Sequence, residues 1–280
     1  MRTLLVHRTT YRYARPIRLG PQWVRLRPVP DPRRPVAPYR LVVTPAPLSM
    51  HWQVGPLGNQ VARLVLPGPL QVLALEVSLE LDLSPINAFD FLLDPAAETW
   101  PFQYSATELD VLAPYRRVDQ AGPLMEALHA GTSAPGDTVP FVLELAAAVR
   151  DRVAYVVRAE AGVWPADWTL REERGSCRDS AWLLVQLLRM HGIAARFVSG
   201  YLVQTPEDGG PRSGELHAWA DAYLPGAGWI GLDATSGFLT AEGHVALAGG
   251  PEPGAVAPLT GTVEPGAVTL ETSIELRDVT

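Results

Sequence analysis

The hydrophobic period of this sequence changes along the chain, and this change restricts the fold more than any other feature. Between residues 72 and 83, large aliphatic side chains occupy every second position, and polar ones such as Glu76 fall between them. Alternation with a period of two is typical of a β-strand that buries one face. Weaker strand patterns occur at 39–44 and 60–66. We therefore predict an antiparallel, β-sandwich-like domain over residues 1–95.

A helical period replaces this alternation in the middle of the chain. Apolar residues recur at three- and four-residue spacing over 139–156, and Pro140 suits a first helical turn. A second helix is predicted over 177–191, because its apolar residues fall on one face. Ser176 precedes this helix as a suitable N-cap, and Gly192 follows it as a stop signal.

Three apolar strands are predicted after the second helix, at 195–203, 216–224 and 229–232. The segment between the first two of these strands, residues 205–214, is polar and glycine-rich and is interpreted as a surface loop. We therefore predict an α+β protein, in which residues 96–248 form a core with a helix packed on an antiparallel sheet.

Several segments show no regular period. Residues 86–138 contain turn signals and are interpreted as a linker with irregular structure, and residues 160–175 as a loop. Residues 249–265 are rich in glycine and proline and are interpreted as an extended linker. The tail then alternates again over 268–277, which predicts a terminal strand in need of a partner. We expect this C-terminal segment, residues 249–280, to return to the N-terminal domain.

The charge of the chain is unevenly distributed. Ten of the first forty residues are arginine, and Asp31 is the single acid among them, although the net charge of the whole chain is −7. An acidic chain is unlike a typical nucleic-acid binder, so we expect no nucleic-acid partner. The arginines are interpreted as a strand face that meets an acidic surface within the same protein, or alternatively as a docking surface for an acidic partner.

Cys177 is the only cysteine, so no internal disulfide can form and nothing indicates an oxidising compartment. The N-terminus lacks the apolar stretch of a signal peptide, and no window reaches the roughly 18 apolar residues that a membrane span needs. We therefore expect a cytoplasmic protein without a membrane partner.

The sequence Gly175-Ser176-Cys177 places that cysteine at the first turn of the second predicted helix. Backbone N–H groups without helical partners and the positive end of the helix dipole would lie close to its sulfur. Both favour the thiolate, which is the nucleophilic form. The alternative is a small, buried structural cysteine.

His217 and Asp233 are the candidates for supporting groups. His217 lies at the start of a predicted strand, on the face opposite to its apolar residues, and a histidine beside a thiol can accept its proton. Asp233 ends the next strand, where a carboxylate could orient the imidazole. Alternatively, His217 is an ordinary hydrogen-bonded strand residue and Asp233 a strand-end cap.

The order of the three residues decides between these alternatives. Cys177 precedes His217 by 40 residues, and His217 precedes Asp233 by 16. The arrangement resembles the papain-like catalytic core of the transglutaminase superfamily, in which a cysteine opens a helix and histidine and aspartate lie on adjacent strands. The resemblance covers four blocks, at 175–182, 195–201, 217–219 and 228–235. The N-terminal β region is also similar to the domain that precedes this core in bacterial members.

The resemblance implies a role for each of these residues. Cys177 would be the nucleophile, His217 the general base and acid, and Asp233 the orienting group. The backbone N–H of Cys177 would form half of the oxyanion hole, and an upstream tryptophan, Trp164 or Trp168, would supply the other half.

Trp219 and Tyr201 are further candidates, as residues that line the substrate cleft. Like the two upstream tryptophans, each could equally be a packing residue. The five histidines other than His217 show no metal-ligand spacing with acids or with Cys177, so we expect no metal. Phosphate-binding loops are also absent from the sequence, and we expect no organic cofactor.

The resemblance further implies thiol-dependent acyl transfer on a carboxamide or peptide bond, through a thioester. A protein or peptide would be the substrate and an amine the acceptor. Relatives can be joined to another enzymatic domain, so a partner enzyme on a separate chain is also expected. The alternatives are a cysteine peptidase or amidase, and a non-catalytic module that binds peptides or a partner.

Overall fold

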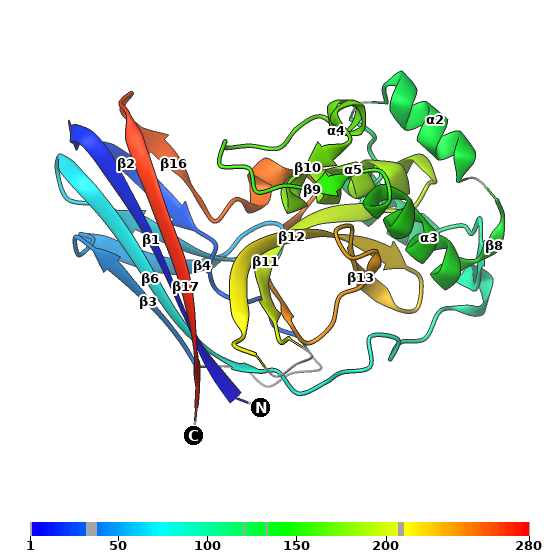
Figure 1. Cartoon of the computed structure of the whole chain (residues 1–280), viewed down its shortest axis with the longest axis horizontal. Coiled ribbons are helices and arrows are strands. Elements are labelled where there is room, and N and C mark those ends of the chain that lie inside the picture. The colour runs from blue at the N-terminus through cyan, green and yellow to red at the C-terminus, as the bar shows by residue number, and fades with distance from the viewer. Residues whose placement is uncertain (1, 32–37, 120, 133, 207–209, 280) are drawn as a thin grey trace.

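Two four-stranded antiparallel sheets form one side of the molecule, and a mixed core of helices and strands forms the other (Figure 1). The structure is a computed structural model that describes residues 2–31, 38–119, 121–132, 134–206 and 210–279. It confirms the α+β class, with antiparallel sheets at the N-terminus and a helix-bearing core after them.

The sandwich takes its strands from both ends of the chain. The first sheet, in the order β17-β1-β6-β3, contains β1 (Arg2–Ile17), β3 (Tyr39–Thr44), β6 (Leu70–Asp82) and β17 (Val268–Asp278). The second sheet, in the order β16-β2-β5-β4, contains β2 (Leu19–Val24), β4 (Ser49–Val54), β5 (Gln60–Val65) and β16 (Leu259–Val263). The alternating residues of β6 face the core between the sheets, and its leucines are buried.

The C-terminal tail is part of this sandwich. Strand β17 pairs antiparallel with β1 from Thr3 opposite Asp278 to Tyr13 opposite Val268, which is where we expected a partner for the tail. The interpretation of residues 249–265 as a linker was wrong in part, because they contain a 3-10 helix (Pro253–Val256) and β16. Strand β16 is short and glycine-containing, so its pairing with β2, not its own sequence pattern, makes it a strand.

The arginines of β1 meet acidic residues on the strands beside them. Arg8 forms ion pairs with Glu76 of β6 at 2.7 Å and with Glu275 of β17 at 2.6 Å, and Arg12 lies 3.2 Å from Glu271. These pairs are solvent-exposed, so each stabilises the fold only slightly. For β1, the interpretation as a strand face that meets an acidic surface of the same protein is confirmed.

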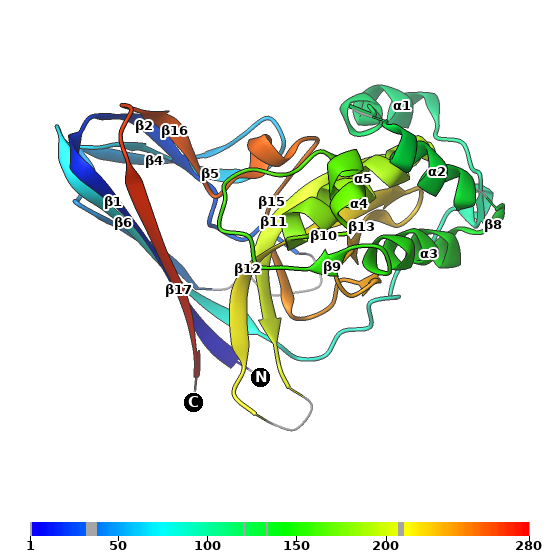
Figure 2. The same ribbon diagram turned by 45° about the horizontal axis from the view of Figure 1, so that its top comes forward.

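The core is built on a five-stranded sheet in the order β14-β13-β12-β11-β15. Its strands are β11 (Ala195–Gln204), β12 (Ser213–Leu224), β13 (Gly228–Asp233), β14 (Phe238–Leu239) and β15 (His244–Gly250). Helix α5 (Cys177–Met190) packs on β12, and α3 (Thr138–Arg150) and α4 (Ala166–Glu172) pack on α5 (Figure 2). Among the described residues, no helix is both long enough and apolar enough to span a membrane.

Three segments differ from the sequence-based expectation. The first predicted helix ends at Arg150, and the chain then enters the two-residue strand β9 (Ala154–Tyr155), which pairs with β10 (Arg174–Gly175). Residues 160–175 contain α4, and residues 86–138 contain α1 (Ala106–Leu112) and α2 (Pro123–Gly131). These helices are too short to show a clear period.

Small elements complete the same region of the chain. They are two 3-10 helices (Pro95–Ala97 and Ala113–Tyr115) and the paired strands β7 (Thr99–Trp100) and β8 (Gly136–Asp137). A capping signal for α1 is present in the sequence, since Ser105 and Glu108 form a capping box around its first turn.

Candidate active site

Cys177 is the first residue of α5 and is 9% exposed. Ser176 occupies the N-cap position, and β10 leads the chain into it. Cys177 and Arg178 are the first two helical residues, so their backbone N–H groups lie near the sulfur without helical acceptors of their own. Cys177 thus lies at the helix N-terminus, as predicted from the sequence. The positive end of the helix dipole there favours negative charge on its sulfur.

Asp179 holds this end of α5 in place. Its fully buried carboxylate accepts hydrogen bonds from the backbone N–H of Ser176 at 2.9 Å, the backbone N–H of Trp164 at 2.8 Å and the Arg158 guanidinium at 3.0 Å. Burial raises the pKa of Asp179, but these hydrogen bonds outweigh burial and lower it below the ordinary value. Asp179 is thus a structural group that joins the 158–164 segment to the helix carrying Cys177.

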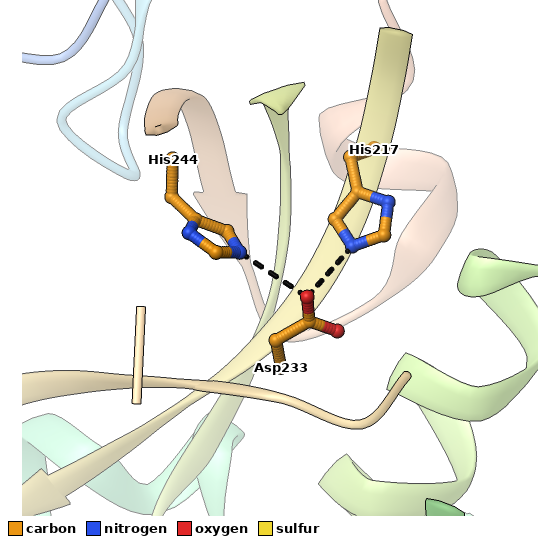
Figure 3. A group of neighbouring side chains, drawn as sticks. All are labelled: His217, Asp233 and His244. Carbon is orange, nitrogen blue, oxygen red and sulfur yellow. Dashed lines mark hydrogen bonds and ion pairs between the residues drawn. The ribbon is translucent and has the colours of Figure 1, made fainter. Parts of the chain in front are cut away.

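His217 and Asp233 meet although they lie on different strands. His217 is on β12 and Asp233 ends β13, and the antiparallel pairing of these strands brings the two side chains together. The Nε2 atom of His217 lies 3.1 Å from Oδ2 of Asp233 (Figure 3). Both side chains are almost completely buried, at 1% and 3% exposed.

The charge state of His217 follows from its neighbours. Burial alone would lower the pKa of His217, but its interactions with Asp233, Cys177 and Glu215 outweigh burial and raise the pKa to about 11. Nε2 is engaged with Asp233, so Nδ1 is the ring nitrogen left for the thiol. Nδ1 has no well-formed hydrogen bond, and Glu215 Oε1 lies 3.5 Å from it. Catalytic hydrogen bonds are often long in the absence of substrate.

Asp233 also binds a second histidine, which sequence reasoning missed. His244 Nε2 lies 3.2 Å from the same Oδ2 atom, while Oδ1 accepts the N–H and the hydroxyl of Thr235, both at 2.8 Å. Burial raises the pKa of Asp233, but hydrogen bonds from His217 and His244 reverse this and hold it far below the usual range. Asp233 is therefore ionised and fully hydrogen-bonded.

The three side chains also form a group that could hold a metal ion. The donor atoms of His217, Asp233 and His244 lie within 4.8 Å of one another, and two imidazoles with one carboxylate suit zinc. A metal-bound imidazole, however, normally donates a proton from its other ring nitrogen. Nδ1 of His244 instead accepts the N–H of Ala241 at 3.2 Å, so this group does not fit a metal. The expectation of no metal stays a prediction.

The four predicted cleft residues lie in different surroundings. Tyr201 is completely buried and hydrogen-bonds His7 of the sandwich, so it has no surface to offer a substrate. Trp168 is 45% exposed, with the guanidinium of Arg171 over its ring. Trp164 is half-buried under Arg158, and its backbone is tied to Asp179 beside Cys177.

Trp219 is buried beside the two histidines. Its ring lies 6.4 Å from that of His217 and 5.3 Å from that of His244. Gly200 provides the space for it, because a Cβ atom at Gly200 would lie 2.4 Å from the Trp219 ring. Trp219 and His244 also border a cavity of about 830 Å³ between the sandwich and the core. Trp219 thus lines the cavity and also packs against the rings of His217 and His244.

Tyr155 is a further residue that sequence reasoning missed. It belongs to β9, whose partner strand β10 ends just before the N-cap of α5, and it is 48% exposed. Burial and the charges of Glu215 and Cys177 raise the pKa of Tyr155. Two residues of alternation are too few to reveal such a strand from sequence.

Comparison with known proteins identifies relatives of both halves of the chain. Residues 126–234 match the transglutaminase-like superfamily, and residues 4–82 match the bacterial transglutaminase-like N-terminal region. An uncharacterized protein of Mycobacterium tuberculosis is 26% identical over 271 residues, covering 92% of this chain and 86% of the relative. An uncharacterized protein of Mycobacterium leprae is 34% identical over 110 residues, or 38% of this chain and 39% of the relative.

A solved structure shares the fold of the whole chain. It is that of a candidate cysteine protease from Cytophaga hutchinsonii, with a TM-score of 0.66, 19% identity, and coverage of 100% of this chain and 92% of the other. Sequence matches to both halves, a common fold over the full length and a cysteine at the head of α5 agree with one another. This chain carries a transglutaminase-like core at residues 126–234 and the bacterial transglutaminase-like N-terminal region at residues 4–82.

Proposed function

We propose that this protein is an enzyme that transfers acyl groups from carboxamide or peptide bonds to its single thiol, and from there to an acceptor. The observation that carries the proposal is the placement of His217. Its Nε2 atom is held by an ionised Asp233 at 3.1 Å, and Cys177 is among the neighbours that raise the pKa of His217. Cys177, His217 and Asp233 then have the roles of nucleophile, base and orienting group.

The first step is the formation of an ion pair. The Sγ–H proton of Cys177 moves to Nδ1 of His217, while the Nε2–H of His217 stays hydrogen-bonded to Asp233 Oδ2. A pKa of about 11 for His217 means that the imidazolium is the stable form at neutral pH. The thiolate lies at the N-terminus of α5, where the helix dipole stabilises negative charge.

The thiolate then attacks the carbonyl carbon of the substrate. The C–S bond forms, the carbonyl electrons move to oxygen, and the N–H groups of the first turn of α5 stabilise this oxyanion. When the C–N bond breaks, Nδ1–H of His217 protonates the leaving ammonia or amine, so that a thioester and a neutral imidazole remain. An amine or water then attacks the thioester carbonyl while Nδ1 of His217 takes its proton. The C–S bond breaks, the acylated acceptor leaves, and the thiolate–imidazolium pair of Cys177 and His217 is regenerated.

The acceptor decides between the two candidate activities. An amine acceptor gives transamidation, whereas water gives a peptidase or amidase. Hydrolysis is favoured by the solvent exposure of the site's edge, where Tyr155 is 48% and Glu215 47% exposed. Transamidation requires that the acceptor exclude water from this edge when it binds.

The proposal is tested by alkylation of the single thiol with iodoacetamide. We expect the wild type to react at pH 6, and the His217→Ala variant to react on the order of 10- to 100-fold more slowly, because a free thiol is almost fully protonated there. Alkylation in 6 M guanidinium is the control for equal intrinsic reactivity. A wild-type thiol that is inert, or indifferent to His217, would refute the proposal.

The two acceptors are then distinguished by the products. Glutamine-containing peptides are incubated with a fluorescent primary amine and analysed by mass spectrometry, with Cys177→Ser as the matched inactive control. A free acid or a cleaved peptide indicates hydrolysis, and an amine adduct indicates transamidation.

A further inference from the structure

His244 is the one histidine that joins the triad residues without a role in the proposed chemistry. It is the first residue of β15, which pairs with β11 on the side away from β12. Its side chain is 12% exposed and reaches across to Asp233, so that both histidines point at one carboxylate oxygen (Figure 3). The carboxylate thus lies between two imidazoles that come from different strands.

A local turn determines which nitrogen of His244 carries the proton. The backbone N–H of Ala241 donates to Nδ1 at 3.2 Å, and the backbone N–H of His244 donates to the carbonyl of Ala241 at 2.9 Å. An amide can only donate, so Nδ1 must be the acceptor nitrogen. The ring proton therefore lies on Nε2, which makes His244 a hydrogen-bond donor to Asp233 Oδ2.

Four donors hold the Asp233 carboxylate in a single orientation. The N–H and the hydroxyl of Thr235 donate to Oδ1, and His244 and His217 both donate to Oδ2. Rotation of the carboxylate away from His217 would break the bond to His244 as well. Trp219 closes this arrangement, because its ring packs edge-on against His244 and nearly parallel to His217.

We propose that His244 is a positioning residue of the catalytic triad, which acts by holding Asp233 in the orientation that supports His217. This inference rests on the proposed function, but it makes a separate statement about tautomer and orientation. His244 also borders the cavity between the sandwich and the core, so its contact with Asp233 extends the site toward that cavity.

The test compares His244→Leu with His244→Gln. Leucine keeps an apolar contact with Trp219 but has no donor, whereas the amide of glutamine can still donate to Asp233. We expect His244→Leu to lower the alkylation rate of Cys177 at pH 6 about 10-fold, by analogy with the hydrogen-bond partners that orient metal-binding histidines, whose removal costs about 10- to 100-fold. Glutamine should restore the rate to near that of the wild type. His51→Leu, at an exposed histidine of β4, is the matched control and should change nothing.

A second measurement is independent of thiol reactivity. Long-range ¹⁵N–¹H spectra of histidine-labelled protein report the tautomer of each ring, and we expect the Nε2–H form for His244. The imidazolium form of His217 should persist to higher pH in the wild type than in His244→Leu, where His217 should deprotonate at lower pH. An Nδ1–H tautomer, or a His217 titration unchanged in His244→Leu, would overturn the inference.

These outcomes separate the inference from the proposed function. If thiol reactivity proves independent of His217 while the spectra show the expected tautomer and the shifted titration, the proposed function fails and the positioning role stands. If reactivity depends on His217 but is equal in His244→Leu and the wild type, the proposed function stands and the positioning role fails. Thermal unfolding of each variant verifies that the fold is intact.

Discussion

Two buried histidines in different regions of the molecule have opposite charge states. His7, on β1, is 1% exposed, and His217, in the core, is 4% exposed. Burial lowers the pKa of His7 to about 4, whereas the pKa of His217 is raised to about 11. Equal burial therefore does not determine the charge of a histidine.

The partners of the two rings explain the difference. His7 contacts only hydroxyl groups, with Tyr201 Oη at 2.9 Å from Nδ1 and Thr9 Oγ1 at 2.7 Å from Nε2. Hydroxyls can satisfy a neutral ring but cannot neutralise a charged one. His217 has the ionised Asp233 at 3.1 Å, which more than offsets the desolvation of the imidazolium. A buried carboxylate is thus what separates the charged histidine from the neutral one here.

Asp233→Asn should give the largest effect, because it removes the charge that distinguishes the surroundings of His217 from those of His7. Asparagine keeps the size of the side chain but removes the charge, and its amide can donate to Nε2 and favour the wrong tautomer of His217. We expect turnover of the amide substrate to fall about 10³-fold or more, measured by product formation in the mass-spectrometric assay. Alkylation of Cys177 at pH 6 should fall with it. Retention of full turnover would mean that His217 does not depend on the carboxylate.

The stability of the protein should fall as pH falls from 6.5 to 4. In this range the unfolded chain takes up a proton that native His7 does not, because its folded pKa is about 4. The free energy of unfolding contributed by His7 should therefore decrease by about 3 kcal/mol. His217 acts in the opposite sense, since its stabilising contribution is complete below pH 6.5 and is lost as pH rises toward 11.

Denaturant unfolding of the wild type and of His7→Gln checks this prediction. Glutamine does not titrate, so its stability should depend less on pH between 6.5 and 4. Equal pH dependence in the two proteins would show that His7 is not held neutral by its surroundings.

Tyr201→Phe should have a smaller effect, which should lower the stability of the protein without changing the reactivity of Cys177. It removes the partner of His7 Nδ1 without changing the shape of the core, and we expect the free energy of unfolding to fall by about 1–2 kcal/mol. Alkylation of Cys177 should be unchanged, because Tyr201 faces the sandwich. A slower alkylation would place Tyr201 in the catalytic site after all.

Glu275→Gln should have the smallest effect. Glu275 pairs with Arg8 on the surface of the sandwich, and both side chains are exposed, at 45% and 41%. Water screens such a pair, so the unfolding midpoint should be indistinguishable from that of the wild type. A clear shift of the midpoint would mean that exposed ion pairs stabilise this protein as well as buried ones.

Local patterns in the sequence were sufficient for much of this fold. The alternation of β6, the apolar face of α5 and the N-cap position of Ser176 predicted these elements close to their observed bounds. Each of these signals depends on residues that are close together in the sequence, so it can be recognised without a structure. Short elements such as β9 and α4 were missed, because two to seven residues do not establish a period.

Some residues of the candidate site were predicted from the sequence, and others were found only in the structure. Cys177, His217 and Asp233 were nominated from sequence, since each has a local signature and their order matches a known family. His244 has no such signature, and it reaches Asp233 only because β15 pairs with β11 in the folded sheet. Tyr201 was a candidate either for the cleft or for packing, and it is buried because the sandwich covers β11.

The sequence by itself determined the sandwich strands β3, β5, β6 and β17, the helix that begins at Cys177 and the order of the three candidate residues, because hydrophobic periods and helix caps act between near neighbours in the chain. Only the tertiary structure decided which groups surround those three residues. Contacts such as those of His244 with Asp233 and of β17 with β1 join residues far apart in the sequence or on separate strands. Their energies depend on burial and distance, which exist only once the sheets are assembled.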